Sequence, residues 1–342
     1  MTRLSALRTL TLTDMGDKAP PLDFITDLQR LDHLILTGPS GHKLRFGSSE
    51  VMCPRVERIT AGTINGITLE SFPNLRELCI HVQGLELIHK SLPTLMDLQR
   101  LVIKGEHSKS QRPKRLTGSS FDPRNNPKPE RVIEILSDFC ASGITLQELD
   151  FFIEDWEPST NEDLIFLSTI GSVHITVYMS SAQYSTVKLL EALKFDNLRT
   201  LRIAFSSEVP YVKIAELTQL ETLQVTYPVV SKGFGTRSTG FGRRKTTYEP
   251  DKSNLSGLAC LASMPNLKNL VIPLSISTNM VKDFVAHIAQ MKRLKHVSVS
   301  IAASCLSDVV TLCNVFGIHC NPFPGIGSMS RFSTYGTSLS RR

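Results

Sequence analysis

The chain has 342 residues, a formal net charge of +6 and a hydrophobic fraction of 41%, which is ordinary for a folded protein. Its length exceeds the usual size of a single compact core. No stretch of about 20 apolar residues is present, and the first residues contain no apolar secretory segment, so we expect neither a membrane-spanning helix nor membrane binding. The seven cysteines form no C-x-x-C pair. We therefore expect reduced, buried thiols in a cytoplasmic or nuclear protein.

One phrase, Phe195-Asp-Asn-Leu198-Arg-Thr-Leu201-Arg-Ile203, recurs through the chain. Its end alternates apolar and polar residues as a half-buried strand does, and its beginning spaces apolar residues by three, as a packed turn would. Eleven copies place their third apolar residue at 10, 34, 59, 78, 101, 149, 173, 201, 223, 270 and 297. Two steps, 101 to 149 and 223 to 270, are roughly double the others, which indicates an insertion or a degenerate repeat. Since one copy cannot bury its own apolar face, the copies must stack.

This spacing resembles a leucine-rich repeat, and the resemblance covers about residues 4–320. It implies an α/β fold: a curved, horseshoe-like solenoid of about 11–12 irregular repeats with a parallel sheet on its concave face and helices on its convex face, as in ribonuclease-inhibitor-like members. The predicted helices cover residues 21–25, 85–92, 130–140, 161–167, 185–193, 211–217, 277–289 and 306–316. The asparagine that commonly follows the strand in this family is missing, so we expect no asparagine ladder there.

The F-x-N-L-R-x-L and P-N-L-K-x-L phrases are similar to repeats of fungal F-box proteins and of intracellular plant immune receptors. The first resemblance implies the substrate-recognition region of a ubiquitin ligase, with the ligase adaptor as a further partner through an F-box. The second implies a ligand-sensing region. Leu4 already lies within the first repeat, and we find neither an F-box nor a G-x-x-x-x-G-K-S/T loop, so we expect a piece of a longer protein or a missing upstream domain.

Two predicted insertions, 107–129 and 228–252, carry net charges of +5 and +4, so the rest of the chain sums to −3. Both are rich in Gly, Pro, Ser, Thr and Asn and are expected to be mobile, solvated loops. Their basic residues include Lys109, Arg112, Lys114, Arg115, Arg243, Arg244 and Lys245. Binding of nucleic acid or an acidic partner through these loops is the alternative, which we favour less. Residues 321–342 are expected to be a disordered tail.

Alternation along the predicted strands assigns residues to the exposed, concave face of the sheet. Most are small and polar, but Arg58, Arg100 and Lys104 form a predicted basic spot beside an acidic spot of Glu148, Asp150 and Glu154. Together with the flanking residues Phe152, Trp156 and Tyr178, and with Arg202 farther along the face, these are our candidates for a partner-binding surface, because aromatic residues and arginine dominate interface energies. The alternative is that these charges neutralise one another across neighbouring strands.

The sequence gives little evidence of a catalytic site. His33, His81, His174 and His296 are predicted on the exposed face but several repeats apart, too far for a shared metal ion or a base–nucleophile pair. No G-x-S-x-G or H-E-x-x-H motif is present. We therefore predict a non-enzymatic scaffold, without cofactor or metal, that binds a protein partner whose identity the sequence does not reveal.

Overall fold

In the computed structural model, the chain divides into two compact units, which are described separately: Met1–Tyr178 with Glu191–Arg199, and Met179–Leu190 with Thr200–Arg342. The described residues are 6–13, 22–37, 51–62, 69–105, 127–160, 162–179, 185–204, 209–226, 253–301 and 303–323. No helix in these ranges has the length and apolar character needed to cross a bilayer.

The described residues contain twelve strands, whose order in the sheet is their order in the chain, and every described pairing is parallel. The strands are β1 (Thr9–Thr13), β2 (His33–Thr37), β3 (Arg58–Ala61), β4 (Glu77–His81), β5 (Arg100–Lys104), β6 (Glu148–Glu154), β7 (Ser172–Tyr178), β8 (Leu198–Ala204), β9 (Thr222–Thr226), β10 (Asn269–Ile276), β11 (His296–Ile301) and β12 (His319–Phe323). Helices or turns connect successive strands. The prediction of an α/β chain with a parallel sheet is therefore confirmed.

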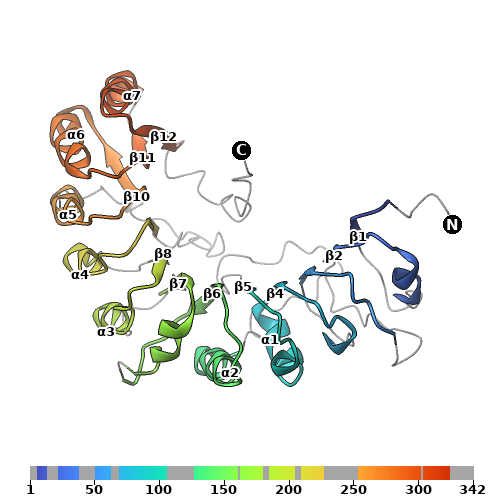
Figure 1. Cartoon of the computed structure of the whole chain (residues 1–342). Coiled ribbons are helices and arrows are strands. Elements are labelled where there is room, and N and C mark those ends of the chain that lie inside the picture. The colour runs from blue at the N-terminus through green and yellow to red at the C-terminus, as the bar shows by residue number, and fades with distance from the viewer. Residues whose placement is uncertain are drawn as a thin grey trace, which may run out of the picture. The chain divides into compact units, whose positions relative to one another are not determined.

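In the first unit, two α-helices lie on the same side of the strands, as Figure 1 shows. They are α1 (Val82–Ile88) and α2 (Pro129–Ala141), and the described part of the unit also contains the short 3-10 helices η2 (Leu22–Asp27), η3 (Leu69–Ser71), η4 (Leu92–Thr94) and η6 (Ile165–Thr169). Helix α2 buries Val132, Ile135, Leu136 and Phe139, which recur at helical spacing. The described connections thus cover one face of the sheet in this unit, and among the described residues the other face is formed by side chains of the strands.

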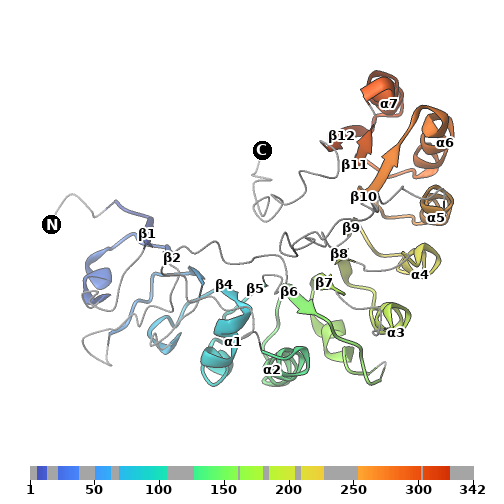
Figure 2. The ribbon, with the colours of Figure 1, turned by 180° about the vertical axis from the view of Figure 1, so that it is seen from behind.

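In the second unit, helices α4 (Tyr211–Ala215), α5 (Ser253–Leu261), α6 (Val281–Gln290) and α7 (Leu306–Val315) all lie on one side of strands β9 to β12 in both views (Figure 1, Figure 2). Two 3-10 helices, η7 (Thr278–Met280) and η8 (Ala303–Cys305), precede α6 and α7. Helix α3 (Thr186–Ala192) and strand β8 lie where the chain passes between the units.

The register confirms the predicted strand positions. The third apolar residues of successive copies are direct partners: Leu10, Leu34, Ile59, Leu78, Leu101, Leu149 and Val173 in the first unit, and Leu201, Leu223, Leu270 and Val297 in the second. From Leu34 onward these side chains are buried. A slip of one residue would turn each apolar set toward solvent, so burial itself specifies the register. Strand β5 pairs directly with β6, and β9 with β10, so the two long steps are insertions rather than degenerate repeats.

Backbone hydrogen bonds repeat from strand to strand at the beginning of each copy. The carbonyl of Asp32 accepts from the N–H groups of both Glu57 and Arg58, each at 3.0 Å. In the second unit, the carbonyl of Lys268 accepts in the same way from Lys295 and His296. Because one carbonyl binds two consecutive amides of the next strand, these bonds also set the register.

An amide ladder lies before the strands rather than after them. Asn74 Nδ2 donates to the carbonyl of Pro54 at 2.7 Å, and Asn266 Nδ2 donates to that of Thr218 at 3.1 Å. Asn197 Nδ2 donates to Leu167 at 2.7 Å and also to Ile170. Each asparagine immediately precedes the second apolar residue of its phrase. The Asn of the recurring phrase thus fastens its turn to the preceding one.

Several predicted boundaries differ from the structure. Helix α1 begins three residues before the predicted start at 85, because His81 Nδ1 accepts from the N–H of Gln83 at 3.3 Å and caps it there. The helix predicted at 161–167 is instead the 3-10 helix η6, and α5 was not predicted. Strand β12 continues to Phe323, so the predicted boundary of a disordered tail at 321 falls within a strand. All seven cysteines are free, but the prediction that they are buried is wrong for Cys79, Cys140 and Cys260, which are partly exposed.

Candidate functional site

Side chains alternate between the core and the exposed face of the sheet in the first unit, as predicted. On β4, Leu78 and Ile80 are buried while Glu77 and Cys79 are partly exposed. On β5, Leu101 and Ile103 are buried, and the alternate positions are partly or fully exposed. The exposed face of this unit therefore consists of the polar half of each strand.

Four charged residues of alternating sign occupy one level of this face. Arg58, Glu77, Arg100 and Glu148 are successive register partners on β3, β4, β5 and β6. We call these four residues the charged row. Glu77 stands between the two arginines, so the prediction of a basic spot separate from an acidic spot is wrong: the charges alternate strand by strand.

Ion pairs connect residues of the charged row with one another and with neighbouring side chains. Arg100 Nε lies 3.0 Å from Glu148 Oε1, and Arg100 Nη1 lies 3.9 Å from Glu77 Oε2. Arg58 Nη2 pairs with Asp32 Oδ1 at 2.8 Å, and His174 Nε2 lies 3.8 Å from Glu148 Oε1. The side chains of the row are 34–45% exposed, so each pair stabilises the fold by less than about 1 kcal/mol. The row remains accessible to a partner.

Two residues that matter here were not among the predicted contact residues. Glu77 lies on the exposed face between Arg58 and Arg100 but belongs to neither of the predicted charged spots. Asp32 immediately precedes β2 and pairs with Arg58 across the β2–β3 pairing. Their positions along the strands could have identified both residues. Glu77 is the first residue of its strand, as the other three residues of the charged row are, and Asp32 directly precedes the first residue of β2.

Lys104 and Asp150 lie beyond the charged row, farther along the same strands. Lys104 is exposed, and its positive charge lies near the thiol of Cys79. Burial nevertheless raises the pKa of Cys79, although Lys104 and Arg100 act to lower it. Asp150 is partly exposed and is the register partner of Val102 and His174. Because burial raises the pKa of Cys79, its thiol stays protonated and is not an activated nucleophile.

The predicted aromatic anchors lie inside the unit and not on its surface. Phe152 is 8% exposed, Trp156 is 3% exposed and Tyr178 is 9% exposed. The ring of Phe152 lies against Gly105: a Cβ atom placed on that glycine would lie 1.9 Å from Phe152 Cδ1. The prediction that these aromatic residues flank an open surface is therefore wrong, because three consecutive residues of β6, 151–153, are all buried.

The chain turns sharply where β6 ends. Asp155 adopts a positive φ of 48°, and its N–H donates to the carbonyl of Tyr178 at 2.7 Å. Tyr178 is the register partner of Glu154 on β6. Burial raises the pKa of the Tyr178 phenol, and the carboxylates of Glu154 and Asp155 add to this effect. Tyr178 thus supports the turn through its backbone carbonyl, and its phenol stays neutral.

The histidines of the first unit are not assembled into a site. His33 Nε2 lies 3.2 Å from Thr60 Oγ1, and burial, followed by the charge of Arg58, lowers the pKa of His33. Burial lowers the pKa of His81 to about 4. Within the described ranges no group of three or more His, Cys, Asp or Glu side chains is placed to hold a metal ion.

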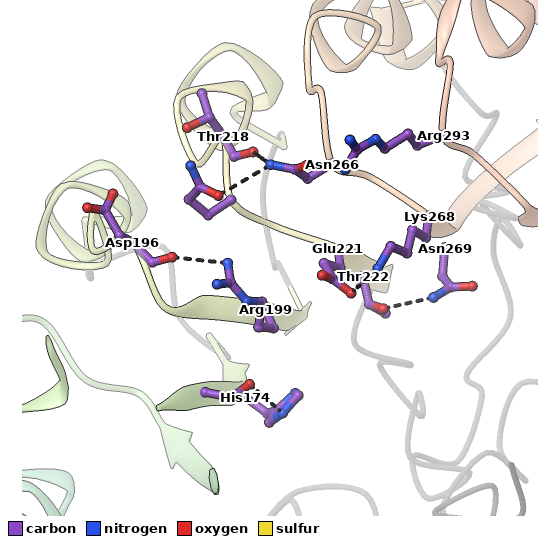
Figure 3. Close-up of polar contacts among 12 residues, drawn as sticks. His174, Asp196, Arg199, Thr218, Glu221, Thr222, Asn266, Lys268, Asn269 and Arg293 are labelled. Carbon is purple, nitrogen blue, oxygen red and sulfur yellow. Dashed lines mark hydrogen bonds and ion pairs between the residues drawn. The ribbon is translucent and has the colours of Figure 1, made fainter. Parts of the chain in front are cut away.

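The corresponding face of the second unit is largely uncharged. Arg202 on β8 is the register partner of Gln224 on β9, and Asn269 Nδ2 donates to Thr222 Oγ1 at 3.0 Å (Figure 3). His296 and His319 are register partners with ring centroids 5.7 Å apart. The predicted basic-loop residues, Lys109, Arg112, Lys114, Arg115, Arg243, Arg244 and Lys245, lie outside the described residues.

Figure 3 also shows contacts at the beginning of strands in the second unit. Lys268 Nζ pairs with Glu221 Oε2 at 2.7 Å, and Arg293 Nη1 donates to Asn266 Oδ1 at 2.8 Å. These contacts lie beside the uncharged face and join one connecting turn to the next.

Neither the protein-family models nor the curated proteins compared with this chain include a match.

Proposed function

We propose that this chain is a leucine-rich-repeat solenoid that binds another protein without catalysing a reaction, and that the charged row of the first unit is its contact surface. The alignment of the third apolar residue of every copy supports the repeat interpretation. The one observation that carries the binding proposal is the charged row itself. Four consecutive strands present charges on a face that none of the described helices of this unit covers.

The energetics of the row support binding more than stability. Exposed ion pairs add little to folding, so stability alone does not require four aligned charges. The same charges, buried against complementary groups of a partner, would orient that partner and speed its association. Farther along β6, the buried ring of Phe152 lies against Gly105, which directly follows β5, and would hold these two strands together.

The resemblance to fungal F-box proteins extends this proposal to substrate recognition for a ubiquitin ligase. Its basis is the Phe195-Asp-Asn-Leu198 phrase and its relatives, in which the asparagine fastens neighbouring turns. Co-purification of the ligase adaptor with the full-length product tests this extension separately from partner binding itself.

Two matched arginines provide the test of the binding proposal. Arg100 pairs with two glutamates on the strand face, and Arg131 pairs with two glutamates, Glu86 and Glu134, on the helix side. Their side chains are 34% and 36% exposed. We would capture partners from cells with the full chain, with Arg100→Glu and with Arg131→Glu, and identify them by mass spectrometry.

The proposal predicts that a defined protein is lost with Arg100→Glu and retained with Arg131→Glu. Circular dichroism of both variants excludes unfolding as the cause. Retention of every partner by Arg100→Glu, or equal loss with both variants, would show that the charged row does not carry binding.

A further inference from the structure

We infer that the partner presents an α-helix that lies across strands β3 to β6, with alternating acidic and basic residues on one stripe. This inference rests on the proposed function and concerns the same charged row. It follows from the spacing of the four charges, from their alternation of sign and from the small side chains beside them.

The spacing of the row matches a helix. Neighbouring strands lie about 4.8 Å apart, so the charges of β3 to β6 recur at about 0, 4.8, 9.6 and 14.4 Å. A helix rises about 1.5 Å per residue, so residues i, i+3, i+7 and i+10 of one stripe recur at about 0, 4.5, 10.5 and 15 Å. The two series agree to within about 1 Å at every position.

An extended segment does not match the row. Its side chains on one face recur about every 6.7 Å, so the fourth lies about 20 Å from the first. Such a segment drifts out of step with the strands by about 2 Å at each charge. A helix laid across the strands can therefore pair with all four charges, whereas an extended peptide can pair with only one or two.

The level next to the charged row suits the body of a helix. Thr60, Cys79 and Val102 are register partners two residues farther along β3, β4 and β5, and each is small and partly exposed. This second level lies about 6.6 Å from the first, so a helix about 10 Å across would cover both. A partner helix would place small apolar residues over Thr60, Cys79 and Val102, and a polar or basic residue over Asp150, which holds this level on β6.

The charges determine what the partner stripe contains. Acidic residues would lie over Arg58 and Arg100, and basic residues over Glu77 and Glu148. The spacing reads the same from either end but the order of charges does not, so a given partner stripe fits the row in one direction only: a helix with Glu, Lys, Glu and Lys from its N-terminus would run from Arg58 toward Glu148. About three turns suffice to span the four strands.

Synthetic peptides test the inference directly. The matched probe is a 17-residue alanine-rich helix with Glu, Lys, Glu and Lys at i, i+3, i+7 and i+10. The block probe has the same composition, with Glu, Glu, Lys and Lys at these four positions. A third probe keeps the matched charges but carries a central proline, which breaks the helix. Each is labelled, and its affinity for the full chain is measured by fluorescence anisotropy at low salt.

We expect the matched probe to bind about tenfold more tightly than the block probe, because two favourable charge contacts become repulsive in the latter. The proline probe should bind as weakly as the block probe. Equal binding of all three probes, or no binding of the matched probe, would overturn the inference.

The charge-exchange variant Glu77→Arg/Arg100→Glu should reverse the preference between the matched probe and the block probe. It keeps the net charge but changes the row from alternating to two like pairs, so it should prefer the block probe. If circular dichroism shows that the variant is unfolded, the comparison of the three probes on the wild-type chain still tests the inference. Loss of a native partner with Arg100→Glu without matched-probe binding would refute the helix alone, whereas a partner unaffected by Arg100→Glu would refute the proposed function.

Discussion

Arg100 on β5 and Glu148 on β6 are register partners, and Arg100 Nε lies 3.0 Å from Glu148 Oε1 although 48 residues separate them in the chain. The pair is the centre of the charged row, because Arg100 also faces Glu77 on its other side. Its side chains remain one-third exposed. Because both side chains are exposed, the pair adds little to the stability of the fold and forms part of the accessible surface.

Replacement of Arg100 by alanine should affect stability only slightly. The exposed ion pairs that it removes are worth less than about 1 kcal/mol each, so the free energy of unfolding should fall by about 1 kcal/mol or less. Urea unfolding followed by circular dichroism measures this change. A loss above about 3 kcal/mol would mean that the row is a stabilising element and not an accessible surface.

Replacement of Gly105 by alanine should be more costly. The added Cβ would overlap the ring of Phe152, which packs against the glycine. Displacement of a packed ring costs about 1–3 kcal/mol. The double variant Gly105→Ala/Phe152→Ala isolates the cause: in the Phe152→Ala background the alanine at 105 should cost almost nothing, whereas an unchanged cost would place the strain elsewhere.

Asn197 tests the amide ladder. Its side chain donates to the carbonyls of Leu167 and Ile170, so Asn197→Ala should lower the free energy of unfolding by about 1–3 kcal/mol through the loss of two hydrogen bonds. The matched control is Asn314→Ala on α7, where the asparagine is exposed. Its effect should stay within about 0.5 kcal/mol. Similar losses in both variants would argue against the ladder.

His81 predicts a pH dependence of stability. Its folded pKa of about 4 lies below the ordinary value of 6.5, so the folded state excludes the proton that the unfolded state takes up. The stabilisation is complete above pH 6.5 and is lost as the pH falls through about 4, with a total of about 3 kcal/mol. His81→Gln should flatten the unfolding free energy against pH between 6.5 and 4. An unchanged slope would contradict the burial of a neutral imidazole.

The strands could be predicted because their apolar positions alternate regularly around residues such as Leu78 and Leu101, and burial leaves one register. The starts and types of the helices in the connections were less predictable. The start of α1 depends on a cap by His81, and the shape of residues 162–169 depends on polar contacts of Asp163 that favour a short 3-10 turn.

The candidate site was only partly predictable. Alternation placed Arg58, Arg100 and Glu148 on the exposed face, and the predicted basic and acidic spots lay side by side as β5 and β6 do. The alternation of sign was missed because Glu77, which lies between the two arginines, was left out. The aromatic residues were misplaced because alternation ends within β6, where Phe152 packs over Gly105. Contacts between residues far apart in the chain determine that change, and a periodic pattern does not contain them.

The most direct test of the central claim is site-specific photo-crosslinking in cells. Lys104 at the end of β5 and Lys90 after α1 are both exposed lysines of the first unit, on the strand face and the helix side. Each is replaced in turn by a photo-reactive amino acid, and crosslinked products are identified by mass spectrometry. We predict a defined protein crosslinked from position 104 and not from position 90. Crosslinking of that protein from position 90 alone would contradict a contact surface on the charged row.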